Sequence, residues 1–301
     1  MAFDNVDENE KDLYAGKSPD IYSGYKPKQT WVIRNDIRNK IEHYNINKSN
    51  KQEHPAALRP YSKYLDDFAR HNHFNVVHPT LKLLARGLEL PEDTLIKQHQ
   101  FDAEGESSIR FMKYFPRSKE EEEKTEHVWL KGHYGMLDLE LCGTKRSLSS
   151  LDTDCVSVLW SQPIGGLQIR SPDGKWRWIK HMDNALVINA GDGLDFLCGG
   201  YYPPTCHRVV QPPADQANCA RLGVFYFCYA DEDVQLAPHT ESSVLQRVGI
   251  KSQLKPGTVA PTMRQWRSSR VKSYGQVKLT EGAEKGVEEE VVLGVVVKHY
   301  N

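Results

Sequence analysis

Hydrophobic and polar positions follow three different patterns along the chain. Residues 1 to about 50 are polar with scattered aromatic side chains and show no sustained period, which predicts an irregular arm. Over residues 55–90, apolar residues recur at spacings of three and four, the period of an amphipathic helix. We expect one or two helices here, interrupted over His73–Pro79, and a third short helix that begins at Pro91.

After Phe101 the period changes to two. Short segments rich in β-branched and aromatic residues are separated there by Gly, Pro, Asp and Asn, as is typical of β-strands. Eight or nine strands after a helical layer predict a jelly-roll barrel, so the expected fold class is mainly β with flanking helices. The run of four glutamates at 120–123 is interpreted as a solvated turn. The predicted strands are SIRFMKYF, HVWLKG, SVLWSQ, GGLQIRS, KWRWIK, ALVINAG, DFLCG, CHRVVQ and RLGVFYFCYA.

The tail from Pro256 contains a basic amphipathic pattern over 262–274 and then an acidic-to-apolar run, EEEVVLGVVVKHYN. The first pattern predicts a helix, which either closes over the barrel as a lid through Trp266 and Tyr274 or simply docks on it. The final run predicts a docked strand or helix. No repeat divides the chain, so we expect one domain with an arm and helical layer at 1–100, a jelly-roll core at 101–235 and a lid or docking segment at 236–301.

Composition narrows the possible classes of function. Lys and Arg number 39 against 40 Asp and Glu, so a net charge of -1 gives no electrostatic reason to bind nucleic acid or an anionic membrane. No apolar run reaches the roughly 18 residues that a spanning helix needs, and the acidic first residues do not resemble a secretory signal. We expect a soluble cytoplasmic protein whose partner is a small molecule. The six cysteines form no CxxC pair and are interpreted as reduced core thiols rather than a zinc cluster.

Two histidines stand out by their context. His133 ends the strand-like VWLKGH, and His207 begins HRVV directly after the turn GGYYPPTC. Each alone is readily explained as a structural histidine, but the surrounding sequence adds a pattern. From Gly165 the chain reads GGLQIRSPDGKWRWIKHMDNALVINAGDGLDFLCGGYYPPTCHRVV, followed by RLGVFYF. In order and spacing, over about residues 100–230, these motifs resemble the isopenicillin N synthase-like family of Fe(II)- and 2-oxoglutarate-dependent oxygenases.

The resemblance implies a metal site. Non-haem Fe(II) that binds both an oxoacid and oxygen needs three protein ligands on one octahedral face, which two histidines and a carboxylate supply. Carried over from the motif of the family, the ligands are His133, Asp152 and His207. The implied cofactors are Fe(II), 2-oxoglutarate as cosubstrate, and O2.

The resemblance also implies a site for 2-oxoglutarate. Arg221 matches the arginine that receives the far carboxylate of the cosubstrate, because a guanidinium fork suits a carboxylate better than an ammonium does. The family usually has serine two residues later, where this chain has Gly223, so one hydrogen bond to the cosubstrate is in doubt. Tyr114 matches a tyrosine that often contacts the same carboxylate, and it is equally well explained as a core aromatic residue.

The HxD pair of the family is interrupted in this chain. Residues i and i+2 of an extended segment point to the same side, so that spacing lets both side chains reach one metal ion. Here Ser150 occupies the position two before Asp152. Deleting residues 135–151 would join His133, Tyr134 and Asp152 into HxD. The surplus segment is either a real loop or a retained intron in the gene model. We favour the intron, because 17 residues correspond to 51 nucleotides, a plausible length for a short intron that keeps the reading frame, and because codons for the flanking residues can contain a GT donor and an AG acceptor.

The start of the chain also departs from the family. Relatives begin with a segment that supplies an early strand and a helix under the barrel, whereas only the helical pattern from about residue 55 is recognisable here. We therefore expect a partial, apparently truncated N-terminal layer that leaves an apolar face exposed.

Together these patterns predict an oxygenase that hydroxylates, desaturates or cyclises a small organic compound, such as a secondary metabolite. The alternative is a catalytically impaired or inactive barrel, because the HxD motif is interrupted and the N-terminus is short. A cupin-like binding barrel shares the fold but does not explain Arg221.

Overall fold

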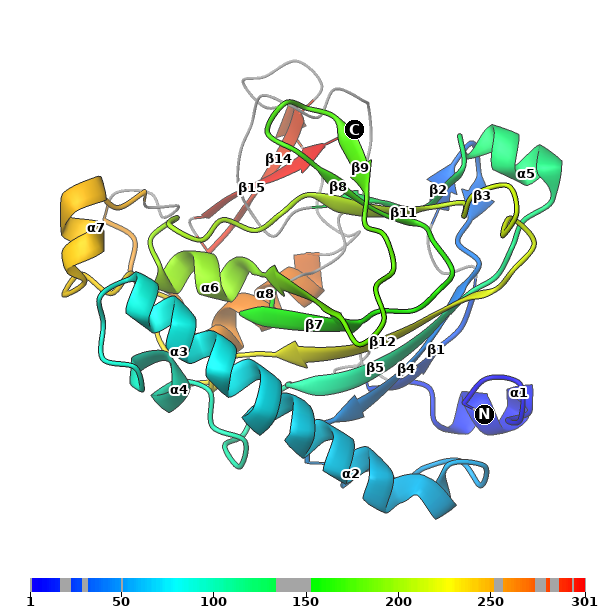
Figure 1. The fold of residues 1–301 in the computed structure, drawn as a ribbon, viewed down its shortest axis with the longest axis horizontal. Coiled ribbons are helices and arrows are strands. Elements are labelled where there is room, and N and C mark those ends of the chain that lie inside the picture. The colour runs from blue at the N-terminus through cyan, green and yellow to red at the C-terminus, as the bar shows by residue number, and fades with distance from the viewer. Residues whose placement is uncertain are drawn as a thin grey trace.

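Two facing antiparallel sheets form the centre of the computed structural model (Figure 1). The structure describes residues 2–16, 23–28, 32–49, 51–133, 153–251, 257–273, 280–281, 287–293 and 295–300. The larger sheet has six strands in the order β1-β4-β5-β12-β7-β10, and the smaller has four in the order β6-β11-β8-β9. Because the chain passes back and forth between the sheets from β5 to β12, the predicted jelly roll is confirmed.

The strands of the jelly roll follow the segments with period-two alternation. On β12, for example, Phe225 packs into the cluster between the sheets, whereas Tyr226 faces the helical layer outside. Alternate residues of β12 and its neighbours therefore line the barrel. The eight strands are β5 (Ser108–Tyr114), β6 (Val128–His133), β7 (Val156–Trp160), β8 (Leu167–Arg170), β9 (Trp176–Trp178), β10 (Leu186–Ala190), β11 (His207–Val210) and β12 (Arg221–Cys228).

Two predictions inside the barrel region are wrong. The segment DFLCG belongs to a helix, α6 (Asp192–Leu197), whose residues are all buried, so its short apolar run carries no period that separates helix from strand. The four glutamates lie in another helix, α5 (Lys119–Lys124), which a capping box between Ser118 and Glu121 begins. Glu122 is not solvated either, since its carboxylate accepts a 2.6 Å hydrogen bond from Nε1 of Trp129.

The first fifty residues are more regular than predicted. The strand β4 (Ile41–Asn47) pairs with β5 along its whole length, and β1 (Gly24–Lys26) extends the same sheet. Polar side chains occupy both buried faces of β4, which hides the alternation of a strand. Phe3 and Val6 join the main core, so the described part of the arm covers apolar surface that was expected to be exposed. The remaining elements of the arm are α1 (Glu8–Leu13), β2 (Val32–Arg34) and β3 (Ile37–Arg38).

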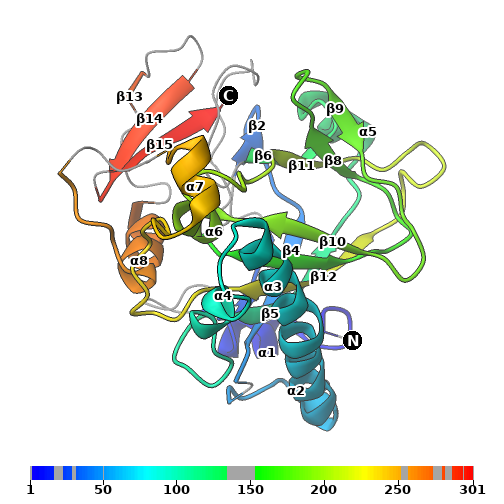
Figure 2. The same ribbon diagram turned by 60° about the vertical axis from the view of Figure 1, so that its left-hand side comes forward.

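A long helical layer crosses the outer face of the larger sheet (Figure 2). The interruption predicted near Pro79 is a change of helix type rather than a break, because a π-helical turn joins two α-helices. Hydrogen bonds from this turn reach β7 and β12: Trp160 Nε1 donates to Asn72 at 2.8 Å, and His73 contacts the Tyr226 hydroxyl at 2.9 Å. The layer comprises η1 (Arg59–Tyr61), α2 (Ser62–His71), η2 (Asn72–Val77), α3 (His78–Gly87) and the predicted short helix α4 (Thr94–Lys97).

The C-terminal part contains two helices and a separate three-stranded sheet. Trp266 of α8 is fully buried and meets the Phe196 ring edge-on at 5.1 Å, so α8 docks on the barrel instead of standing over it as a lid. Tyr274 lies outside the described residues. The final acidic-to-apolar run, which was predicted to form a docked strand or helix, forms two antiparallel strands. The elements are α7 (Ser243–Val248), α8 (Met263–Ser273), β13 (Thr280–Glu281), β14 (Val287–Val292) and β15 (Val295–Tyr300).

Four of the five cysteines in the described ranges are buried free thiols, as predicted, and Cys219 is exposed. Across those same ranges, no helix combines the length and the apolar character needed to cross a membrane.

Candidate active site

The two singled-out histidines lie side by side on the smaller sheet. His133 is the last residue of β6 and His207 the first residue of β11, and they are directly opposite each other across this antiparallel pair. Directly opposed residues in such a pair have Cβ atoms about 5 Å apart. The fold thus places two residues that are 74 positions apart in the sequence next to each other. The side chain of His133 lies outside the described part of the structure.

The His207 ring is oriented by the backbone. Its Nδ1 lies 3.0 Å from the carbonyl oxygen of Thr205, and a carbonyl can only accept, so Nδ1 carries the proton. In a neutral imidazole this leaves Nε2 with the lone pair that a metal ion would take. Val209, which shares a face of β11 with His207, packs between the sheets, so this face is the inner one.

Asp152 and the surplus segment 135–151 lie outside the described residues. The geometry of the predicted HxD pair is therefore not described. Within the described ranges, no group of three side chains is placed to bind a metal ion.

Arg221 and Tyr114 are brought together at the other end of the barrel. They are direct partners across β12 and β5, and the guanidinium carbon lies 5.3 Å from the centre of the Tyr114 ring. Both are almost completely buried. Burial lowers the pKa of Arg221, since a charged guanidinium loses hydration there, and the Tyr114 ring only partly offsets this.

The Arg221 guanidinium has unused donors. Its Nε and Nη1 are buried and find no acceptor among the described residues. A buried ionised group without a counter-charge is strongly destabilising, so such groups are normally paired or bind an anion. Gly166 approaches the same side chain closely, because a Cβ there would lie 3.3 Å from Cδ of Arg221 and 2.9 Å from the carbonyl oxygen of Val210. The side chain of Arg221 is therefore closely packed, and its unpaired N–H groups are available to donate to an anionic ligand.

The position where the family usually has serine is filled by an aromatic ring. A Cβ added to Gly223 would lie 2.6 Å from Cε2 of Phe225, the next residue on the same face of β12. Serine would therefore need Phe225 to move. The departure from the family pattern has a local physical reason, which the sequence did not reveal.

Arg110 of β5 also faces the barrel interior and was not singled out from the sequence. Its Nε donates a 2.7 Å hydrogen bond to Oδ1 of Asn45. A signal was available, since Arg110 lies four residues before Tyr114 in a strand and therefore shares its face. The reason it was missed is that its neighbour Asn45 lies in the arm that was predicted to be irregular.

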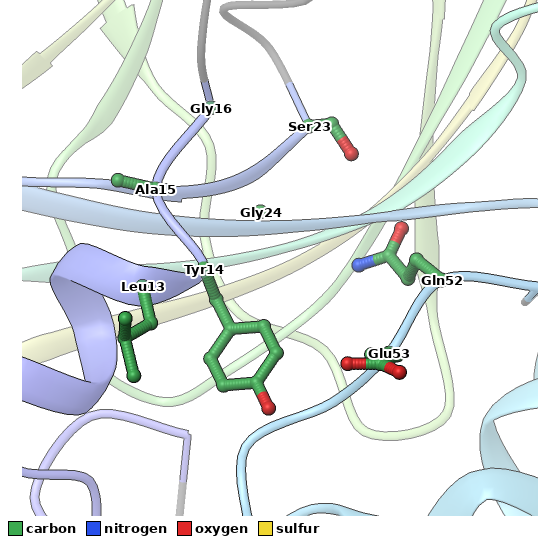
Figure 3. A pocket seen from close by; sticks show the side chains of 8 residues that line it. All are labelled: Leu13, Tyr14, Ala15, Gly16, Ser23, Gly24, Gln52 and Glu53. Atoms are coloured by element: carbon green, nitrogen blue, oxygen red, sulfur yellow. The ribbon is translucent and has the colours of Figure 1, made fainter.

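A pocket of about 370 Å³ opens at the surface of the N-terminal arm (Figure 3). None of its lining residues belongs to the predicted site. They come from the end of α1, the start of β1 and the loop after β4: Leu13, Tyr14, Ala15, Gly16, Ser23, Gly24, Gln52 and Glu53.

Residues 109–229 match the family model of the 2OG-Fe(II) oxygenase superfamily. This stretch spans the jelly roll from β5 to the end of β12 and includes all six predicted site residues.

Curated relatives agree with this match. The chain is 25% identical to a 2-oxoglutarate-dependent dioxygenase of Gibberella zeae over 189 residues, which are 62% of this chain and 50% of that protein. It is 29% identical to gibberellin 2-beta-dioxygenase 2 of Arabidopsis thaliana over 164 residues, 54% of this chain and 41% of that protein. The chain thus spans about half the length of the curated relatives it matches.

Solved structures share the fold. A Neurospora crassa protein crystallised in complex with alpha-KG and 5-formyluracil superposes with a TM-score of 0.69 over 89% of this chain and 78% of that chain, at 16% identity. A 2OG-Fe(II) oxygenase family protein from Caulobacter crescentus has a TM-score of 0.62 over 89% and 81% of the two chains, at 19% identity. At these identities the likeness shows the fold alone.

Proposed function

We propose that this chain, whose residues 109–229 match the family model of the 2OG-Fe(II) oxygenase superfamily, is an Fe(II)- and 2-oxoglutarate-dependent oxygenase of a small organic substrate. The observation that carries the proposal is the Arg221 guanidinium, buried inside the barrel with Nε and Nη1 unpaired among the described residues. A carboxylate at this point would accept a charge-assisted hydrogen bond from the guanidinium and supply the missing counter-charge. 2-Oxoglutarate presents such a carboxylate at the far end from its oxoacid group.

The proposed metal ligands are His133, Asp152 and His207. Support comes from the direct pairing of the two histidines across β6 and β11, and from the Thr205 carbonyl that fixes the His207 tautomer with Nε2 as acceptor. Two imidazoles and a carboxylate are a donor set suited to Fe(II) with open positions. When bound, the metal would supply activation of O2 coupled to oxidative decarboxylation of 2-oxoglutarate to succinate and carbon dioxide.

The remaining residues would position the cosubstrate. Arg221 would hold its far carboxylate, and the Tyr114 ring beside it would orient the guanidinium and exclude water. Because Gly223 has no side chain, the Phe225 ring would line this part of the site. An apolar surface would then replace the hydroxyl of the family's serine. We expect Arg221 therefore to carry a larger share of cosubstrate binding than in relatives with serine.

Turnover tests the proposal. The purified protein with Fe(II), 2-oxoglutarate and O2 should form succinate in an amount equal to the 2-oxoglutarate consumed. His207→Ala should reduce this turnover by at least about 100-fold, because one of three metal ligands is lost. His239→Ala, which removes a histidine outside the barrel that contacts Glu241, is the matched control. Undiminished turnover in His207→Ala would contradict the ligand assignment.

The inactive-barrel alternative makes a different prediction for residues 135–151. If this segment impairs metal binding, a variant lacking 135–151 should bind Fe(II) more tightly than the full chain, because His133-Tyr134-Asp152 then forms HxD. Equal affinity of the two proteins for Fe(II) would show that the segment is a tolerated loop, and sequencing of the spliced transcript would separate loop from intron.

A further inference from the structure

Arg110 places a second cationic group inside the barrel, away from the proposed cosubstrate site. It is the direct partner of Phe225 across β5 and β12, and Phe225 packs against the cluster between the two sheets. Partners across a sheet point to the same face, so Arg110 is directed into the barrel. The side chain is half-buried, which leaves it accessible to a ligand that enters.

The guanidinium of Arg110 is positioned but not neutralised. Its Nε donates to Oδ1 of Asn45 at 2.7 Å, and its central carbon lies 4.5 Å from the centre of the Phe227 ring. No carboxylate within the described ranges forms an ion pair with it. Among the described residues, Nε is the nitrogen of Arg110 that has a hydrogen-bond acceptor, so the two terminal nitrogens keep their four N–H donors for a planar acceptor such as a carboxylate.

Arg110 disfavours the positively charged forms of two basic side chains nearby. Lys26 and His43 are direct partners across β1 and β4, and His43 is in turn the partner of Met112 on β5, the strand of Arg110. Burial, followed by the charge of Arg110, lowers the pKa of Lys26 to about 7. The same causes, with Lys26 added, hold the pKa of His43 well below its usual value. A charged ligand in this region would therefore be an anion.

Arg110 lies toward the end of the barrel that carries His207. The chain crosses the smaller sheet in β11, turns through residues 211–220 and returns across the larger sheet in β12 (Figure 1). His207, at the start of β11, and Phe227, near the end of β12, are therefore at the same end, and Arg221 is at the other. Phe225, the partner of Arg110, lies four positions after Arg221 on β12, which is about 13 Å along the strand.

We propose that Arg110 binds a carboxylate of the substrate, so that this chain acts on small organic acids. The proposal rests on the proposed function for the location of the reacting end of the barrel. Asn45 and Phe227 position the guanidinium. Arg221 and Arg110 would thus divide two anions between them, the cosubstrate at one end of the sheet and the substrate at the other.

The test compares phenylacetate with phenylacetamide, which have the same ring and differ in charge. Each is titrated calorimetrically into the anaerobic protein with Fe(II) and saturating 2-oxoglutarate. Phenylacetate should bind, and phenylacetamide should bind about tenfold or more weakly, because a charge-assisted bidentate contact is absent. Arg110→Gln should remove this preference, and Arg110→Lys should retain part of it.

Two further variants separate a binding role from a structural one. Asn45→Asp would place a carboxylate beside Arg110, and it should weaken phenylacetate binding although the arginine remains. Arg247→Gln is the matched control, because it removes an exposed arginine that pairs with Glu89 on the outer helices. The proposal would be overturned if phenylacetate does not bind to the unmodified protein. It would also be overturned if phenylacetate binds to Arg110→Gln as tightly as to the unmodified protein.

Failure of the proposed function would appear in a different arm. 2-Oxoglutarate is titrated separately into the unmodified protein and into Arg221→Gln. Loss of phenylacetate binding in Arg221→Gln but not in Arg110→Gln would place the anion in the cosubstrate site and so refute the Arg110 assignment. If phenylacetate binding depends on Arg110 but 2-oxoglutarate does not bind, the acid-binding site at Arg110 is supported and the proposed oxygenase function is refuted.

Discussion

The buried guanidinium of Arg221, with two donors that lack acceptors among the described residues, lowers the stability of the fold when no ligand is bound. We predict that Arg221→Met, which keeps the length and removes the charge, leaves the free energy of unfolding unchanged or raises it by about 1–3 kcal/mol in the absence of ligands. Chemical denaturation of both proteins without 2-oxoglutarate checks this. A loss of several kcal/mol in the variant would mean that Arg221 is already paired within the protein.

Gly223 shows how one missing side chain changes its neighbour. Gly223→Ser should lower the free energy of unfolding by about 1–3 kcal/mol, because its Cβ would overlap the Phe225 ring. The double variant with Phe225→Leu should recover most of this loss, since the smaller side chain frees the space. Urea denaturation of the two variants, with Phe225→Leu alone as the control, measures the coupling. Additive losses would show that the two positions are independent.

Asp195 of α6 predicts a dependence of stability on pH. It is fully buried, both carboxylate oxygens lack partners among the described residues, and burial with the nearby Asp192 raises its pKa to about 8. In the unfolded chain the pKa is close to 3.8, so the folded state favours the protonated form. Its contribution to stability is complete below about pH 4 and is lost as the pH rises through 8.

Asp195→Asn should therefore be more stable relative to the unmodified protein at pH 8 than at pH 5. The difference is bounded by about 1.4 kcal/mol for each unit of pKa shift over that interval. Thermal unfolding at both pH values measures it, with Asp102→Asn, an exposed carboxylate, as the control. The same difference at pH 5 and pH 8 would refute a protonated Asp195.

At the residue scale, spacing along the sequence predicts which side chains meet but not what surrounds them. Tyr114 is the strand partner of Arg221, and His133 is the strand partner of His207. The ring over Gly223, the unpaired Asp195 and the inward Arg110 depend on three-dimensional packing between strands far apart in the chain. No local pattern encodes such contacts.

Strands rich in β-branched and aromatic residues were predictable, whereas α6 and β4 were not. The eight barrel strands match the segments rich in β-branched and aromatic residues, and α8 matches the amphipathic pattern over 262–274. By contrast, α6 is buried throughout and β4 is buried on both faces, so neither shows the contrast of apolar and polar positions that marks an element. For α5, the capping box of Ser118 and Glu121 was the available signal.

The π-helical turn is the element that fixes the helical layer on the sheet. Tyr226→Phe removes the hydroxyl that contacts Nδ1 of buried His73, and should lower the free energy of unfolding by about 1–3 kcal/mol. Tyr201→Phe, which alters an exposed tyrosine, should change it by less than about 0.5 kcal/mol. Denaturant unfolding compares the two. Equal effects would mean that the His73 contact does not anchor the layer.

At the scale of the whole molecule, the barrel separates two ends of different chemistry. The paired histidines are at one end of the smaller sheet. Arg221, whose Nε and Nη1 find no acceptor among the described residues, is at the opposite end of the larger sheet. 2-Oxoglutarate matches both ends, because its oxoacid group can chelate a metal ion at the histidines and its far carboxylate can bind Arg221. The central claim is therefore that 2-oxoglutarate binds in this barrel through Arg221.

An anaerobic titration of 2-oxoglutarate into the Fe(II)-loaded protein tests this claim most directly, with the weak visible charge-transfer band as the readout. We predict a saturable band in the unmodified protein and an increase in Kd of at least about tenfold in Arg221→Gln, whose side chain is polar but carries no charge. Arg247→Gln should bind as the unmodified protein does. No band in the unmodified protein, or equal affinity in Arg221→Gln, would contradict the account.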